Sequence, residues 1–128
     1  MLRDAWTHDR RRGDRRLVSF LLEAHIDGAE SPSRVRELGV GGMVVQAARA
    51  WPAGATVSFS LGSGAEATGR MEGHVAHSRL MLSQRHEGSP VYLTGVAFAR
   101  VTPDQVARVA AWLAAVDQRG PGRSTVVP

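Results

Sequence analysis

The sequence predicts an all-β protein, an antiparallel barrel or sandwich of about six short strands followed by one C-terminal helix. Three observations support this prediction. Apolar and polar residues alternate over short runs, which is the period of a half-buried strand. Turn residues separate the runs at regular spacing, which favours an antiparallel sheet over alternating strand–helix units. After Thr102 the apolar period becomes that of an amphipathic helix.

Each predicted strand is bounded by turn residues. The first covers the alternating run from Val18 to Ile26, and the others span residues 35–38, 43–45, 57–61, 65–77 and 91–98. The stretch Gly39–Gly42 is predicted to be a turn, because glycine reaches positive φ at little cost. The polar stretch from Ser78 to Pro90 is predicted to be a loop.

The helix is predicted to run from Pro103 to Arg119. Thr102 is a suitable N-cap, proline is favoured at the first helical position, and Gln105 completes a capping box. Gly120 is predicted to end the helix. The apolar residues at helical spacing are predicted to face the barrel, and they are Val106, Val109, Ala110 and Leu113.

The length of 128 residues fits one folded domain. We expect a flexible arginine-rich arm at 1–16, the barrel and its helix at 17–119, and a loose tail at 120–128. The absence of cysteine excludes a disulfide framework and a thiolate metal site. No signal-peptide pattern opens the chain and no apolar run reaches the length of a membrane span, so we expect a cytoplasmic protein without membrane insertion.

Basic charge is concentrated at the start of the chain, in the stretch Arg10–Arg16. Six of the 16 arginines fall within the first sixteen residues, and the chain has no lysine. A guanidinium group is a planar fork of donors that suits phosphate oxygens and the O6/N7 edge of guanine. The alternative interpretation is a solvated arm without a ligand. A net charge of only +4 argues against a broad nucleic-acid surface.

The histidines, the catalytic motifs searched for and the tryptophans do not indicate a metal site or an active site. His74 and His77 are three residues apart in a predicted strand, which puts them on opposite faces and argues against a metal site. No catalytic motif is present, so we expect no enzyme activity and no cofactor. Trp51 and Trp112 are predicted to be packing residues rather than base-stacking platforms.

Four segments together resemble the bacterial PilZ domain family. Arg11–Arg15 resembles the family's Arg-x-x-x-Arg motif before the first strand, and Glu37–Gly42 lies where the family has Asp/Asn-x-Ser-x-x-Gly. Gly73–Val75 resembles its Gly-x-Val strand, and Gly95–Phe98 resembles its Gly-Val-x-Phe strand. The resemblance covers about residues 10–118, and the order and spacing of the segments are more specific than any one of them.

The resemblance implies a six-stranded antiparallel PilZ-like barrel with a C-terminal helix, and a non-enzymatic module that binds cyclic diguanylate. In the family the motif arginines contact the phosphates and guanines, and the second motif completes the site. The residues implied here are Arg11, Arg15, Glu37, Gly39 and Gly42. Arg12 and Arg16 have the same spacing as Arg11 and Arg15, so a second register of the arginine motif is open. Arg11 and Arg15 are preferred because they put the first strand in the family's usual apolar phase, and Arg10, Arg12 and Arg16 are the alternative ligand contacts.

Two positions depart from the family's second motif. Glu37 is one methylene longer than aspartate, and Gly39 lacks the hydroxyl of serine. A lost hydrogen bond to a charged group costs about 1.5–3 kcal/mol, so we expect reduced affinity. One alternative is a degenerate PilZ domain that binds no nucleotide and acts through protein contacts, for example in motility or pilus control. Another is a small barrel that binds nucleic acid through its arginine arm.

Overall fold

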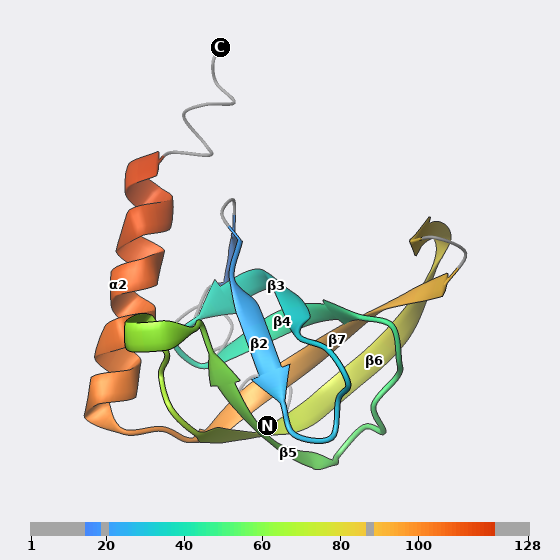
Figure 1. Cartoon of the computed structure of the whole chain (residues 1–128), viewed down its shortest axis with the longest axis horizontal. Helices are drawn as coiled ribbons and strands as arrows, with labels where there is room; N and C mark the ends of the chain where they lie inside the picture. Colours follow the sequence, from blue (N-terminus) through green and yellow to red (C-terminus); the bar gives the residue numbers. More distant parts are fainter. Residues whose placement is uncertain (1–14, 19–20, 87–88, 120–128) are drawn as a thin grey trace, which may run out of the picture.

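The strands of the computed structural model form a closed antiparallel barrel, and one helix packs at its side (Figure 1). The structure describes residues 15–18, 21–86 and 89–119. The elements are β1 (Arg16–Leu17), β2 (Glu23–Ile26), β3 (Ser33–Gly39), β4 (Gly42–Ala47), β5 (Thr56–Leu61), the 3₁₀ turn η1 (Gly64–Glu66), β6 (Met71–His86), β7 (Ser89–Arg100) and α2 (Pro103–Arg119). The predicted fold class, a six-stranded antiparallel barrel with one C-terminal helix, is confirmed.

The barrel closes because β3 pairs with strands on both of its edges. The sheet runs in the order β1-β3-β2-β5-β6-β7-β4, and β4 pairs back onto β3. Since β4 occupies one edge of β3, both β1 and β2 lie along the other edge. Together β1 and β2 fill one place in the barrel. The single first strand predicted from Val18 to Ile26 is therefore two short strands, and the first of them begins earlier, at Arg16.

A β-bulge in β3 changes which side chains face inward. Val35 pairs with Val45 and Glu37 pairs with Val44, so Arg36 is one extra residue on this strand. Strict alternation would put Glu37 on the inner face with Val35. The extra residue instead turns Glu37 outward, where it is half-exposed, and keeps Leu38 in the core. The Nη1 of Arg36 donates to the Oε1 of Gln46 at 2.6 Å, which anchors the bulged residue to β4.

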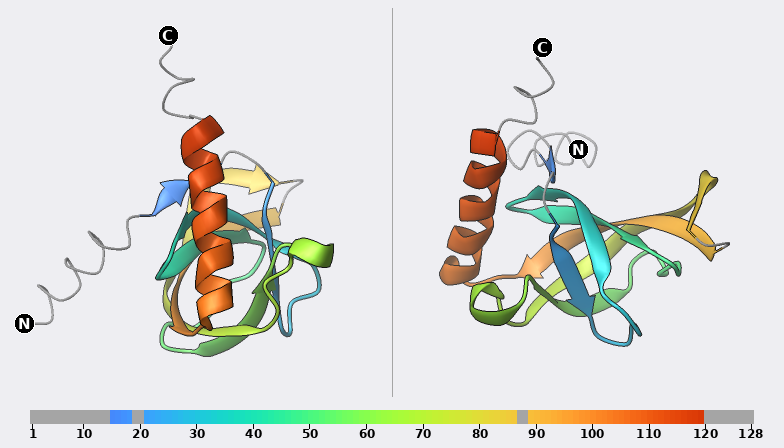
Figure 2. Two further views of the ribbon diagram at one scale, coloured as in Figure 1. Left: turned by 90° about the vertical axis from the view of Figure 1, so that its left-hand side faces the viewer. Right: turned by 45° about the horizontal axis from the view of Figure 1, so that its top comes forward.

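The predicted loop from Ser78 to Pro90 is wrong, because β6 and β7 continue as a long hairpin. β6 extends to His86 and β7 begins at Ser89. Figures 1 and 2 show the tip of this hairpin projecting beyond the barrel, on the side away from α2. A two-stranded ribbon outside the barrel has no inner face to fill, so it does not require the apolar alternation on which the strand predictions relied.

The strand predicted from Ala65 begins later than expected, at Met71. Residues Gly64–Glu66 form the turn η1, and Gly69 adopts a positive φ of 78° just before the strand starts. A short irregular connection of this kind changes the chain direction between β5 and β6. It also brings η1 next to the middle of α2, where it contributes to a pocket described below.

The core fills the inside of the barrel with apolar side chains from every full strand. The rings of Phe59 and Phe98 lie 5.6 Å apart between centroids, and Trp51 is buried at the edge of the same cluster. The largest fully buried apolar side chains are Phe59, Leu38, Met43, Leu61, Met71, Val35, Val45 and Val109. The packing role predicted for Trp51 is confirmed, and so is that of Trp112, which packs half-buried against the core.

The helix α2 has the predicted bounds and the predicted capping box. The backbone N–H of Gln105 donates to the Oγ1 of Thr102 at 3.1 Å, and the backbone N–H of Thr102 donates to the Oε1 of Gln105 at 2.9 Å. No helix in the described ranges is long and apolar enough to cross a membrane.

The face that α2 turns to the barrel differs from the prediction at two positions. Val109 is fully buried and Leu113 is half-buried, as expected, but Val106 is 36% exposed and Ala110 is exposed. Gln105 is buried instead. Its Nε2 donates to the carbonyl oxygens of Thr68 and Arg70, and these bonds compensate for burying an amide. A polar residue, Gln105, thus faces the barrel in place of the predicted Val106.

Candidate functional site

The pairing of β1 with β3 brings the end of the arginine-rich stretch beside the second motif. Arg16 lies opposite Leu38, and Leu17 lies opposite Glu37. The backbone N–H of Val18 donates to the carbonyl oxygen of Arg36 at 2.9 Å and extends the pairing. The chain therefore enters the barrel alongside the strand that carries Glu37 and Gly39.

Arg15 and Glu37 form an ion pair at this corner. The Nε of Arg15 lies 3.6 Å from the Oε1 of Glu37, and the two side chains are 30% and 39% exposed. An ion pair this accessible to water contributes only about 0–1 kcal/mol to stability. Its main effect is on orientation, because it holds a guanidinium group at the outer surface of the barrel next to the β3–β4 turn. The bulge at Arg36 makes this contact possible by turning Glu37 outward.

The β3–β4 turn is a tight hairpin in which Gly39 lies opposite Gly42. The predicted turn is confirmed, and it forms without positive φ, since none of Gly39, Gly41 and Gly42 is among the positive-φ glycines of the described residues. Gly42 is needed for another reason. A β-carbon there would stand 2.7 Å from the carbonyl oxygen of Val96, so glycine allows β4 and β7 to approach each other. Gly42 therefore has a packing role whether or not a ligand binds.

Of the predicted ligand residues, the structure brings together Arg15, Glu37, Gly39 and Gly42 at one corner of the barrel. Arg16 lies next to them in β1 and is exposed. Arg10, Arg11 and Arg12 lie outside the described residues.

His74 and His77 are both exposed on β6, a strand whose side chains do not alternate regularly between its two faces. A register shift between Val75 and His77 inserts one extra residue, so the argument that His74 and His77 face opposite sides fails. The Nδ1 of His74 lies 3.2 Å from the Oγ1 of Thr56. Within the described ranges, no three His, Cys, Asp or Glu side chains are grouped closely enough to hold a metal ion.

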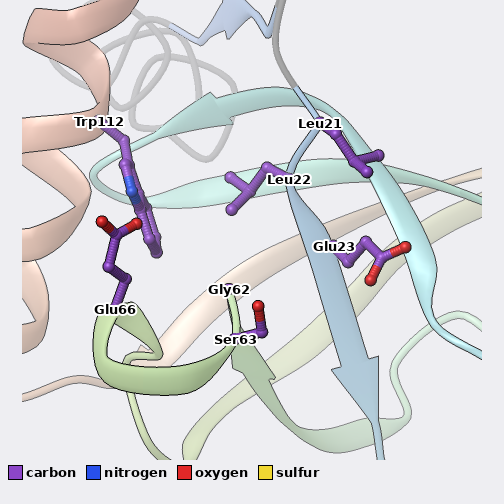
Figure 3. A pocket seen from close by; sticks show the side chains of 7 residues that line it. All are labelled: Leu21, Leu22, Glu23, Gly62, Ser63, Glu66 and Trp112. Atoms are coloured by element: carbon purple, nitrogen blue, oxygen red, sulfur yellow. The ribbon is translucent and has the colours of Figure 1, made fainter.

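A pocket that no sequence motif indicates lies between α2, the start of β2 and the end of β5. Its volume is about 170 Å³, and Figure 3 shows Trp112 and Glu66 on one side with Leu21 and Glu23 on the other. The lining residues come from three separate parts of the chain, and no motif connects them. Only the closure of the barrel and the docking of α2 bring them together.

No family model and no curated protein matches this sequence. Solved structures do match the fold. The PilZ domain with c-di-GMP of YcgR from Escherichia coli has a TM-score of 0.64 at 14% identity, and the match covers 92% of this chain and 99% of that one.

Two further structures are similar. The Bacillus subtilis Inhibitor of motility (MotI/DgrA) has a TM-score of 0.61 at 17% identity, over 86% of this chain and 52% of that one. The Borreliella burgdorferi PlzA protein in complex with c-di-GMP has a TM-score of 0.54 at 10% identity, over 93% of this chain and 58% of that one. This chain thus spans little more than half of those two proteins. The similarities establish a PilZ-like fold.

Proposed function

We propose that this chain is a non-enzymatic cytoplasmic sensor that binds cyclic diguanylate at the corner formed by β1 and the β3–β4 turn. The observation that carries the proposal is the pairing of β1 with β3, which brings Arg15 within 3.6 Å of Glu37. Two of the structures with this fold, those of YcgR and PlzA, contain c-di-GMP, and this supports the choice of ligand.

The chemistry of the corner suits such a ligand. Cyclic diguanylate carries two phosphate charges and two guanine bases, and a guanidinium group can serve both through its fork of donors. Arg15 directly precedes β1 and is partly exposed, so it can reach a ligand while β1 stays paired with β3. In the proposed complex, Arg11 and its neighbours Arg10, Arg12 and Arg16 supply further cationic contacts. Glu37, Gly39 and Gly42 form the other side of the site.

We propose that cyclic diguanylate binds more weakly here than at a site with the family's complete second motif. Gly39 offers no side-chain hydroxyl to the ligand, and Glu37 already accepts an ion pair from Arg15 that a phosphate must compete with. Losing one hydrogen bond to a charged group costs about 1.5–3 kcal/mol, or roughly ten- to a hundredfold in affinity.

Glu37 and Gly39 also favour a second candidate function. In this alternative the chain is a PilZ-like module that no longer binds nucleotide and acts through protein contacts. The similarity to a protein described as an inhibitor of motility supports a regulatory protein partner. The two functions differ in one measurable property, which is whether the full-length chain binds cyclic diguanylate.

The test is a calorimetric titration of the full-length chain with cyclic diguanylate. We expect saturable binding that is at least about tenfold weaker in Arg15→Ala, because that change removes a charge-assisted contact. Arg79→Ala, at an exposed position on β6, is the matched control and should bind as the wild type does. Absence of heat at millimolar ligand, or an equal loss in both variants, would contradict the proposal. Cyclic diadenylate serves as the control for base recognition.

A further inference from the structure

Arg36, the extra residue of the β3 bulge, extends its side chain over the outer surface of the barrel. Val45 points into the core, so its neighbour Gln46 points outward, and the Nη1 of Arg36 donates to the Oε1 of Gln46 at 2.6 Å. Glu37 follows Arg36 in the chain and also turns outward, but it reaches toward β1, where it meets Arg15. Arg36 reaches toward β4 instead. A guanidinium group therefore lies on each side of Glu37.

The hydrogen bond to Gln46 uses one end of the Arg36 guanidinium group. Within the described residues, no hydrogen bond engages the opposite edge, formed by Nε and Nη2, which carries two parallel N–H donors. No carboxylate in the described ranges pairs with Arg36 either, and the amide of Gln46 is neutral. The half-buried side chain thus presents a positively charged pair of donors whose orientation is set by its bond to β4.

A fixed pair of donors distinguishes guanine from adenine. Guanine presents two acceptors, O6 and N7, on one edge, and an arginine fork can bond to both at once. Adenine presents N7 beside the amino donor N6–H₂, so one donor of the fork would face another donor. Leaving polar groups unpaired in this way lowers affinity, and the site then prefers guanine.

We propose that Arg36, held by Gln46, binds O6 and N7 of one guanine of cyclic diguanylate and thereby selects this ligand over cyclic diadenylate. The inference rests on the proposed nucleotide site at the Arg15 corner and names the residue that gives this site its base preference. Gln46 is a positioning residue, because it orients the fork without touching the ligand. The bulge turns Arg36 outward, in keeping with the occurrence of bulges next to functional sites, where they redirect a side chain.

The spacing along β4 allows one ligand to meet both arginines. Val44 lies opposite Glu37, and Gln46 is two residues further along the strand, a distance of about 7 Å. Cyclic diguanylate carries two guanines on one macrocycle, so its phosphates can lie at Arg15 while one base reaches Arg36.

The test is calorimetric titration of the full-length chain with cyclic diguanylate and, separately, with cyclic diadenylate. We expect the wild type to bind cyclic diguanylate at least about tenfold more tightly. Arg36→Lys keeps the charge but removes the fork, so the ratio of the two dissociation constants should fall at least about fivefold. Arg36→Gln, the second variant, should lower it as much. An unchanged ratio in both variants would overturn the proposal even if affinity fell, because Arg36 would then be a phosphate contact or a structural residue.

Arg34→Gln is the matched control. Arg34 is an exposed arginine on the same strand, opposite Gln46 in the register, and it makes no hydrogen bond to Gln46 in the described structure. Loss of its charge should weaken both ligands to a similar extent and leave the ratio unchanged. A fall in the ratio equal to that of Arg36→Gln would overturn the proposal, because selectivity would then depend on surface charge alone.

Variants of Gln46 test the positioning role. Gln46→Leu removes the acceptor and should lower the ratio in the wild type but not in the Arg36→Lys background, because the two residues act together. Gln46→Glu keeps an acceptor, so it should preserve the ratio although its charge weakens the binding of both ligands. Equal effects of Gln46→Leu in the two backgrounds would show that Gln46 does not act through Arg36.

The outcomes separate this inference from the proposed function. If the wild type binds neither cyclic dinucleotide, the proposed nucleotide site is wrong and the inference is wrong with it. If the wild type binds cyclic diguanylate and Arg15→Ala weakens that binding, while the Arg36 variants keep the wild-type ratio, the site is correct. In that case only the recognition of guanine by Arg36 is wrong.

Discussion

Gly62 and Trp112 lie in direct contact, since a β-carbon on Gly62 would stand only 3.1 Å from the indole. Gly62→Ala should therefore destabilise the protein in two ways. The left-handed backbone at Gly62, with a φ of 80°, costs an L-residue about 1–2 kcal/mol, and the new methyl group pushes on Trp112. Gly54→Ala is the matched control, because Gly54 has a φ of 87° with no atom within 4 Å of an added β-carbon. Equal losses of thermal stability in the two variants would show that the contact with Trp112 has no energetic weight.

Gln105→Glu should produce a pH-dependent loss of stability. The variant keeps the oxygen that caps the helix but directs a carboxylate at the carbonyl oxygens of Thr68 and Arg70. We expect a cost of about 2–4 kcal/mol at pH 7 from the lost donor and the repulsion. This repulsion raises the pKa of the introduced carboxyl in the folded state. Stability is then present at low pH, where the protonated acid can donate, and is lost as the pH rises through the raised pKa.

Urea unfolding of the Gln105→Glu variant at several pH values, relative to the wild type, measures this effect. Gln105→Ala is the control, since it removes the same bonds without adding a titrating group. A constant difference between Gln105→Glu and the wild type from pH 3 to pH 8 would contradict the expected mechanism.

Substitutions along α2 should reveal which face is buried. Val109→Ala removes two methyl groups from a fully buried position and should cost about 1–3 kcal/mol. Val106→Ala makes the same chemical change where the side chain is 36% exposed and should cost at least about 1 kcal/mol less. Leu113→Ala, at a half-buried site, is expected to fall between them. The comparison requires thermal or denaturant unfolding of the three variants, and a larger loss in Val106→Ala would reverse the assigned face.

Glu37→Gln should leave the stability of the protein almost unchanged. The ion pair with Arg15 is partly exposed at 3.6 Å, and such pairs contribute about 0–1 kcal/mol. The same substitution should alter cyclic diguanylate binding, because it changes the charge beside Arg15. A loss of thermal stability much above 1 kcal/mol would indicate that Glu37 is mainly a structural residue.

Gly39→Ser should tighten the binding of cyclic diguanylate by restoring a hydroxyl at the second motif. The backbone permits the change, since Gly39 belongs to β3 and is not among the positive-φ glycines. The double variant Glu37→Asp with Gly39→Ser should bind more tightly still. Calorimetry of the wild type and both variants is the measurement. If only the double variant binds, the chain has lost its nucleotide site and the protein-contact function is correct.

The strands and the helix could be predicted wherever the burial pattern is local. Thr102 and Gln105 are close in sequence, so the capping box is visible in the sequence and is confirmed. The buried amide of Gln105 was missed, because its partners Thr68 and Arg70 are far away in the chain. Alternation also fails at the bulge of Arg36, where one extra residue reverses the faces that follow.

In the candidate site, too, some features could be predicted from the sequence and others depend on contacts between distant segments. The proximity of Arg15 to Glu37 agrees with the order of the two motifs, although the ion pair itself depends on the bulge. The pocket at Trp112 had no sequence signal, because it forms only when η1, β2 and α2 meet.

The length of the β6–β7 hairpin has a consequence for the order in which the chain folds. Its two strands are adjacent in sequence, so their pairing closes only a short loop, and isolated hairpins form in about 1–10 μs. The seam between β4 and β7 instead joins residues as distant as Gly42 and Ala97, and its loop-closure entropy is larger. We expect the hairpin to nucleate folding and the β4–β7 seam to close the barrel last. Refolding should then slow more when Val75 is truncated to alanine than when Met43 is, relative to the stability that each change removes.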